Sequence, residues 1–209
     1  GDDPGENGAL AFDFGAVIPM PAILRDSEPS ADVAMGAYAL GFDLRGGSWA
    51  RPDYLAYPWV RALGLATREA FLAWVRAERP QALEQAEAAR RCQEETGFAD
   101  WYGWSIHHWG TKWNAYGFEL LREEPGRLEF RFDTAWSFPG PVFDALADRF
   151  PRLRFDCAVL DEAWNFALRG VLGALAPDDA ELRDVEPDND LAALVFAGPD
   201  GTDRGGEGD

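Results

Sequence analysis

One short stretch of the chain, residues 98–116, holds most of the side chains that could do chemistry. It contains both histidines of the 209-residue sequence, its only lysine and four of its nine tryptophans. The candidates within it are Trp101, Trp104, His107, His108, Trp109, Lys112 and Trp113. Tryptophan rings cover a large apolar area and keep a polar edge, so such a cluster can fill a core or bind a ligand.

A structural role is the first interpretation of this stretch, and the one that we favour. Trp101, Trp104 and His108 fall on one face of a helix, and that face would cover the end of a sheet. Lys112 would then pair with a carboxylate or with backbone carbonyls where the following strand begins, because an ammonium group needs acceptors when it is buried.

Two functional interpretations stay open beside it. In one, the rings stack on a base, a sugar or a peptide, and Lys112 supplies a charge or a cation–π contact. In the other, one of the two histidines is a general base, Lys112 stabilises negative charge, and a carboxylate orients the histidine. The carboxylate would be Glu119, Asp133 or Glu162, and Asp133, Trp136 and Glu162 complete the candidate patch.

The residue types argue against a metal or a cofactor. The two cysteines, Cys92 and Cys157, are too few for a four-cysteine zinc site or a four-thiolate iron–sulfur cluster. Neighbouring histidines on a helix point about 100° apart, so His107 and His108 are poorly placed to chelate one ion. The chain contains no glycine-rich phosphate-binding motif. We therefore expect no metal and no cofactor.

Charge and hydropathy narrow the range of partners. The chain carries 37 acidic and 19 basic residues, a formal net charge of −18, which argues against non-specific binding to nucleic acid or anionic lipid. Eleven of the acids fall within residues 177–209. The polar, glycine-rich ends at 1–8 and 198–209 predict disordered tails. No apolar run reaches the length of a membrane helix, so we expect a cytoplasmic protein.

The order of the predicted elements indicates the fold class. Helices are predicted from Thr67 to Arg79 and from Pro80 to about Thr96, the second mostly in solvent, whereas residues 22–50 indicate irregular structure. A hairpin follows, with strands at 116–120 and 128–136, then a helix over 139–150, then strands at 153–159 and 164–168. This order predicts an α+β fold: an antiparallel sheet with helices on one face. We expect a single domain over 9–197, with a helical insertion at about 52–97.

Several motifs resemble a known family over about residues 9–170. They are Phe12-Asp13-Phe14, Ile18-Pro19-Met20-Pro21, Trp101-Tyr102-Gly103-Trp104, Trp109-Gly110-Thr111-Lys112-Trp113-Asn114 and Phe132-Asp133-Thr134-Ala135-Trp136. The chain resembles the YubB-type ferredoxin-like domain of plasmid- and phage-borne bacterial proteins. The resemblance implies a ferredoxin-like α+β sandwich without an iron–sulfur cluster. It implies no established activity and no catalytic residues.

The chain departs from that family at its beginning. Family members open with a short strand and a helix before the first phenylalanine motif, whereas here Phe12 follows only a short polar segment. We expect that strand and helix to be absent. Phe12 and Phe14 have strand spacing, so residues 9–17 or residues 181–196 could fill the gap in the sheet.

Aromatic density without a recognisable nucleophile, metal or phosphate motif predicts a non-enzymatic binding module of a mobile genetic element. Its partner would be an unidentified protein or small ligand. The alternatives are a small enzyme that uses His107 or His108 with Lys112 and a carboxylate, or an acidic inhibitor of a host DNA-binding protein.

Overall fold

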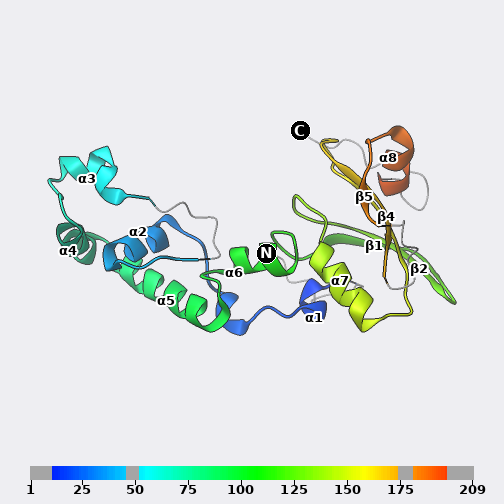
Figure 1. Cartoon of the computed structure of the whole chain (residues 1–209), viewed down its shortest axis with the longest axis horizontal. Helices are drawn as coiled ribbons and strands as arrows, with labels where there is room; N and C mark the ends of the chain where they lie inside the picture. Colours follow the sequence, from blue (N-terminus) through cyan, green and yellow to red (C-terminus); the bar gives the residue numbers. More distant parts are fainter. Residues whose placement is uncertain (1–10, 46–51, 174–180, 197–209) are drawn as a thin grey trace. The chain divides into compact units, whose positions relative to one another are not determined.

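The computed structural model describes residues 11–45, 52–173 and 181–196, and the chain divides into two compact units (Figure 1). The helical unit comprises residues 20–107. The sheet unit comprises residues 1–19 and 108–209. The predicted tails at 1–8 and 198–209 lie outside the described residues. The extent of a single domain over 9–197 stays a prediction.

The helical unit is built from helices alone within its described residues. They are the 3-10 turns η1 (Ala22–Leu24) and η2 (Tyr54–Ala56), and helices α2 (Ala31–Leu40), α3 (Pro58–Ala62), α4 (Arg68–Glu78), α5 (Pro80–Thr96) and α6 (Trp101–His108). The last residue of α6, His108, belongs to the sheet unit. The predicted helices at 67–79 and 80–96 are confirmed. Thr67 Oγ1 accepts a hydrogen bond from the amide of Ala70 at 3.2 Å, which caps α4.

Helix α2 lies within residues 22–50, so the interpretation of this range as irregular structure was wrong for Ala31–Leu40; residues 46–50 lie outside the described residues. The hydroxyl of Ser30 caps its first turn by accepting from the amide of Val33 at 3.2 Å, and Gly41 ends it with a φ of 82°. Apolar residues surround much of this helix, so its sequence shows no polar face opposite an apolar stripe. The periodic signal of a helix was therefore missing.

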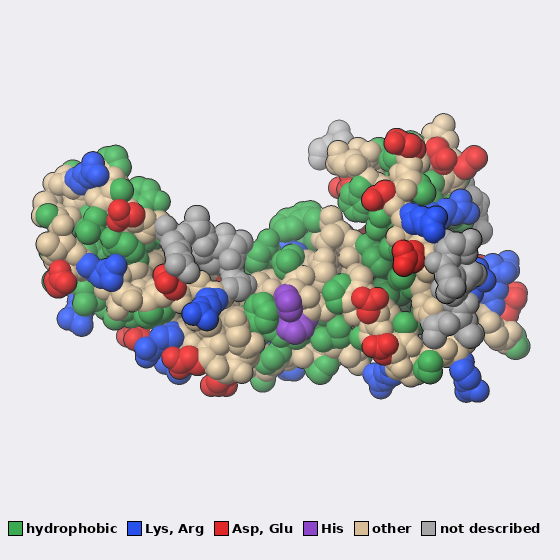
Figure 2. All heavy atoms as spheres, viewed as in Figure 1, with side chains coloured by type: hydrophobic (Ala, Val, Ile, Leu, Met, Phe, Trp, Pro, Cys, Tyr) green, Lys and Arg blue, Asp and Glu red, His purple; other side chains and the backbone are tan. Residues whose placement is uncertain are grey.

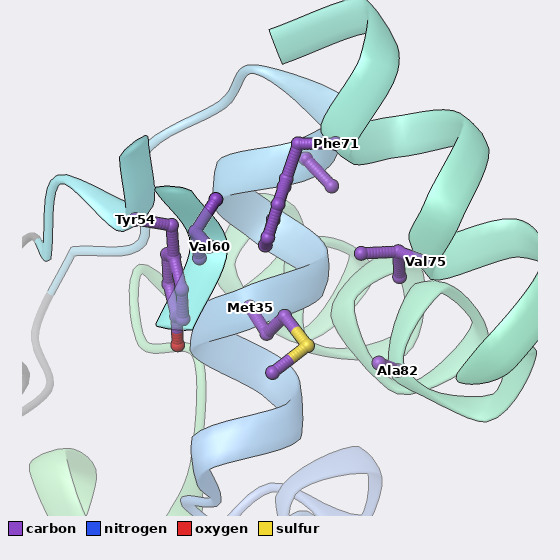
Figure 3. Packing of buried hydrophobic residues seen from close by; sticks show 7 residues of the cluster. Met35, Tyr54, Val60, Phe71, Val75 and Ala82 are labelled. Carbon is purple, nitrogen blue, oxygen red and sulfur yellow. The ribbon is translucent and has the colours of Figure 1, made fainter. Parts of the chain in front are cut away.

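Helix α5 packs closely on α2 through small residues. Ala82, Ala86 and Ala89 are buried on one face of α5. A Cβ atom added to Gly36 of α2 would lie 2.0 Å from the carbonyl oxygen of Ala82. The expectation that α5 lies mostly in solvent was wrong for this face. Its small side chains let the backbones of α2 and α5 approach more closely than large side chains would allow. Figure 3 shows the neighbouring core, which includes Met35 and Phe71.

The sheet unit follows the predicted order of strand, strand, helix, strand, strand. Its elements are α1 (Phe14–Val17), β1 (Tyr116–Glu124), β2 (Arg127–Asp133), α7 (Gly140–Arg149), β3 (Phe155–Leu160), β4 (Ala167–Leu172), β5 (Arg183–Asp184) and α8 (Asn189–Phe196). Strands β1 and β2 form one antiparallel sheet, and β3, β4 and β5 form another in that order. Helices combined with antiparallel sheets confirm the α+β class.

The two segments expected to extend the sheet behave differently. Arg183–Asp184 forms β5 and pairs with β4, so residues after 180 add a strand. Phe14–Val17 forms the short helix α1, so the strand interpretation of this segment was wrong. The reason is local: the carboxylate of Asp13 accepts from the amide of Gly15 at 2.8 Å and caps a helical turn.

Aromatic rings form the interior of the sheet unit beside α7. The ring centroid of Phe12 lies 4.9 Å from that of Phe132 on β2 and 6.0 Å from that of Phe143 on α7. Phe14 is fully buried and lies 6.0 Å from Phe132. The segment before α1 is therefore held against the hairpin and α7. Within the described residues, no helix has both the length and the apolar character needed to cross a membrane.

Candidate functional site

The ten candidate residues are divided between the two units. Trp101, Trp104 and His107 belong to the helical unit. The sheet unit holds the other seven, which are His108, Trp109, Lys112, Trp113, Asp133, Trp136 and Glu162. Helix α6, predicted from the spacing of its tryptophans, carries the first three together with His108.

Trp104 and Trp109 are buried, as the structural interpretation of this stretch expects, whereas the covering of a sheet end by Trp101, Trp104 and His108 stays a prediction. Trp104 is 4% exposed and Trp109 is 7% exposed. The indole nitrogen of Trp109 donates to the carbonyl oxygen of Ile18 at 2.9 Å, and its ring lies 6.0 Å from that of Phe14. A buried indole with a satisfied N–H stabilises the sheet unit and offers no surface to a ligand.

Trp101 and His107 have backbone and ring contacts within the helical unit, whereas His108, the last residue of α6, is half-buried and belongs to the sheet unit. Trp101 is half-buried, and its backbone amide donates to the hydroxyl of Ser27 at 2.9 Å. The imidazole of His107 is exposed and lies 5.3 Å from the ring of Phe98. Histidine side chains are visible at the surface in Figure 2, coloured purple.

Residues 110–113 are held beside residues 133–137 by hydrogen bonds at the end of the β1–β2 hairpin. The hydroxyl of Thr111, which is fully buried, donates to the carbonyl oxygen of Ala135 at 2.6 Å. The hydroxyl of Ser137 donates to the carbonyl oxygen of Gly110 at 2.6 Å. Gly110 has a φ of 78°, and a Cβ there would lie 2.8 Å from Pro141, so glycine is required.

These bonds place Lys112 between two indole rings. The ammonium nitrogen lies 4.2 Å from the ring centroid of Trp113 and 4.8 Å from that of Trp136. Trp113 is 44% exposed and Trp136 is 64% exposed. Among the residues that the structure describes, Lys112 forms no ion pair, so the faces of two aromatic rings take the place of the expected carboxylate or backbone carbonyls.

The backbone at Trp136 departs from the predicted strand. The alternation of residues 128–136 predicted one continuous strand, but β2 ends at Asp133 and Trp136 has a φ of 72°. A bulky side chain rarely adopts this left-handed conformation, which costs on the order of 1–3 kcal/mol and persists where surrounding contacts enforce it. Trp164, in the turn between β3 and β4, has a φ of 60°.

Trp164 is a residue that the sequence reasoning placed in a strand and not in the candidate patch. It is exposed, and its turn is closed by Asp161, whose carboxylate accepts from the backbone amide and the side-chain amide of Asn165. The carbonyl oxygen of Asp161 accepts from the amide of Trp164 at 2.9 Å, and aspartate is favoured at the first position of a β-turn, so Asp161 is the residue that could have indicated this turn.

Acidic and phenolic side chains lie at the same end of the hairpin. Tyr116 opens β1 and stands opposite Asp133, the last residue of β2. Desolvation raises the pKa of Tyr116 above its usual value, and the negative charges of Asp133 and Glu162 raise that pKa further. A Cβ on Gly117 would lie 2.4 Å from a carboxylate oxygen of Asp133, so this carboxylate packs against the start of β1.

Five of these residues therefore form one surface, which we call the hairpin-end patch. The pairing of Tyr116 with Asp133 and the bonds of Thr111 and Ser137 fix the two segments that carry it. Its members are Lys112, Trp113, Tyr116, Asp133 and Trp136. The charge of Glu162 acts on the same Tyr116.

The described residues contain no group of three or more histidine, cysteine, aspartate or glutamate side chains that could hold a metal ion. The free thiol of Cys157 lies on β3, where desolvation and the neighbouring Asp156 raise its pKa to about 11. A thiol that resists ionisation is a poor nucleophile and a poor metal ligand at neutral pH.

Residues 108–170 match the family model described as the ferredoxin-like domain in Api92-like protein. The match begins where the chain returns to the sheet unit and ends within β4, so it includes the hairpin-end patch and none of the helical unit. It supports a ferredoxin-like family for this part of the chain. No curated protein and no solved structure matches the chain.

Proposed function

We propose that this chain is a non-enzymatic binding module, and that its ferredoxin-like part presents the hairpin-end patch to a partner molecule. The observation that carries the proposal is the ammonium group of Lys112 between the exposed rings of Trp113 and Trp136. Exposed tryptophans are enriched at the centres of interfaces, because their rings combine a large apolar area with a polar edge.

The energetics of exposure support this role. A tryptophan buries up to about 250 Å², so roughly 110 Å² of Trp113 and roughly 160 Å² of Trp136 stay in water. At about 25 cal/mol per Å², covering these two rings would contribute roughly 3 and 4 kcal/mol to association, before the costs of association are subtracted. A partner that covers both rings would recover this free energy.

The rings are also pre-organised. The hydrogen bonds from Thr111 and Ser137 fix the backbone of the two segments that carry the rings, and the left-handed backbone at Trp136 fixes the direction of its Cα–Cβ bond. Little conformational entropy is then lost when a ligand binds, which favours recognition. The finer assignment, a YubB-type module of a plasmid or phage, is part of the proposal and is supported by the Trp-Gly-Thr-Lys-Trp motif at 109–113.

The test is a binding titration of the full chain by isothermal calorimetry, whose readout does not depend on the tryptophans that the variants remove. The panel contains a basic peptide, an acidic peptide, adenosine monophosphate and a short oligosaccharide. We expect at least one of them to bind the parent chain and to lose binding in the double variant Trp113→Ala/Trp136→Ala. The matched control is Trp59→Ala in the helical unit, because Trp59 is 39% exposed and lies outside the patch. Binding to no member of the panel, or binding that survives the double variant, contradicts the proposal.

A further inference from the structure

The hairpin-end patch already holds one cation, which indicates what its rings recognise. The ammonium of Lys112 contacts both indole faces, and each ring keeps a large exposed area beyond that contact. The face of an indole carries negative electrostatic potential and attracts ammonium and guanidinium groups. Lys112 therefore makes, within the chain, the kind of cation–π contact that a cation of a partner molecule could make with the same rings.

The charges around the patch favour a cation over an anion. Asp133 and Glu162 are exposed, and Glu162 forms no ion pair among the described residues. At the opposite end of the hairpin, acids are paired with arginines: Glu129 with Arg122 and with Arg127. The whole chain carries a net charge of −18, which repels anions at long range and attracts basic partners.

We infer that the hairpin-end patch binds an arginine- or lysine-bearing segment of a partner protein. This inference rests on the proposed function and names the class of partner. A guanidinium or ammonium group of the partner stacks on the exposed area of Trp136 and Trp113, and the carboxylates of Asp133 and Glu162 balance its charge. Lys112 occupies part of the same surface and opposes the incoming cation.

The probe is a synthetic peptide of alternating arginine and glycine, titrated into the full chain, with an alternating glutamate–glycine peptide and adenosine monophosphate as comparisons. We expect the arginine peptide to bind and the other two not to bind. Trp136→Ala should weaken binding of the arginine peptide about 5- to 30-fold, the range expected for one lost cation–π contact with its apolar area.

Charge variants provide a matched pair. Glu162→Gln should weaken the arginine peptide about 2- to 5-fold at low salt, as expected for an exposed charge pair. Glu123→Gln changes the net charge by the same amount, but Glu123 is exposed on β1 roughly 20 Å along the strand from Tyr116, so it should leave affinity unchanged.

The sharpest variant is Lys112→Gln. Removing the internal cation should tighten the arginine peptide about 2- to 5-fold, because it removes a like charge and vacates ring surface. If Lys112 instead held an anionic ligand, Lys112→Gln would weaken the binding of that ligand. Thermal unfolding of this variant, compared with the parent, shows whether the fold is intact.

Three results overturn the inference. The first is equal binding of the arginine peptide by the parent and by Trp136→Ala, which would mean attraction by net charge alone. The second is weaker binding in Lys112→Gln with an intact fold. The third is binding of adenosine monophosphate at the patch without binding of the arginine peptide. This last result contradicts the basic partner but supports the proposed function, so the two failures are distinguishable.

Discussion

Replacing Gly36 by alanine should destabilise the helical unit, although alanine is the better helix former. The new Cβ would lie 2.0 Å from the carbonyl oxygen of Ala82 and 2.7 Å from the Cβ of Ala86. Ordinary contacts between such atoms are longer by more than 1 Å, so α2 and α5 must separate. The obstacle is backbone, and no change of side-chain rotamer relieves it.

The expected magnitude follows from two opposing effects. Forcing extra volume into a packed interior costs about 1–3 kcal/mol, whereas alanine gains about 0.5–1 kcal/mol over glycine within a helix. The difference is a loss of up to about 2.5 kcal/mol in the free energy of unfolding, with a central value of about 1.3 kcal/mol. For a unit of this size the central value corresponds to a decrease of roughly 5–10 °C in the unfolding temperature.

Thermal unfolding of the full chain, followed by far-ultraviolet circular dichroism, measures this loss. Hydrogen exchange at the amides of α2 and α5 shows that the effect lies in the helical unit. The control is Gly140→Ala at the start of α7, where the added Cβ meets only a ring carbon of Phe138 at 4.0 Å. That control should be neutral or stabilising. A Gly36→Ala variant as stable as the parent would refute the close packing of α2 on α5.

Three further predictions concern the sheet unit. Asn114→Ala should lower the free energy of unfolding by about 1–3 kcal/mol, because the side-chain oxygen accepts from the amide of Phe14 at 2.7 Å and the side-chain nitrogen donates to Asp13 at 2.7 Å; chemical denaturation measures it. Stability should fall as pH rises from about 9 towards 11, because the pKa of the Cys157 thiol is about 11 in the folded chain and near 8.5 in the unfolded chain, so the unfolded chain loses this proton first. A Cys157→Ala variant should lack this part of the pH dependence. If its stability has the same slope against pH as that of the parent, the burial of the thiol is contradicted. Trp136→Gly should be about 1 kcal/mol more stable than Trp136→Ala, because glycine adopts a φ of 72° without strain, and equal unfolding midpoints would argue against a strained backbone there.

Elements with a periodic pattern or a clear cap could be predicted from the sequence. Phe130 and Phe132 alternate with polar neighbours and indicated β2, and Thr67 and Pro80 indicated the starts of α4 and α5. Helix α2 was missed although Ser30 and Gly41 cap it, because its residues are mostly apolar and show no polar face, so the periodic signal of a helix was absent. The alanines that α5 buries do recur at helical spacing, at Ala82, Ala86 and Ala89, but small side chains were not recognised as a packing face.

The sequence indicated which residue types belong to the candidate site, but not which of them are buried and which are exposed. Lys112 and its aromatic neighbours were identified from residue types, but Trp109 is buried and Trp113 is exposed although both belong to one motif. The difference depends on long-range hydrogen bonds, such as that from Thr111 to Ala135, which cross 24 positions of the chain. The left-handed backbone at Trp164 is likewise set by its turn and not by its residue type.

The uniqueness of Lys112 has a practical consequence for anyone who handles this protein. Apart from the amino terminus, its side chain is the only primary amine in the sequence. Succinimidyl dyes, biotinylation reagents and carboxymethyl sensor chips all couple through such amines, so each would attach beside Trp113 and Trp136. A preparation labelled in that way would carry its reporter on the surface under test, and capture through an appended peptide tag keeps that surface open.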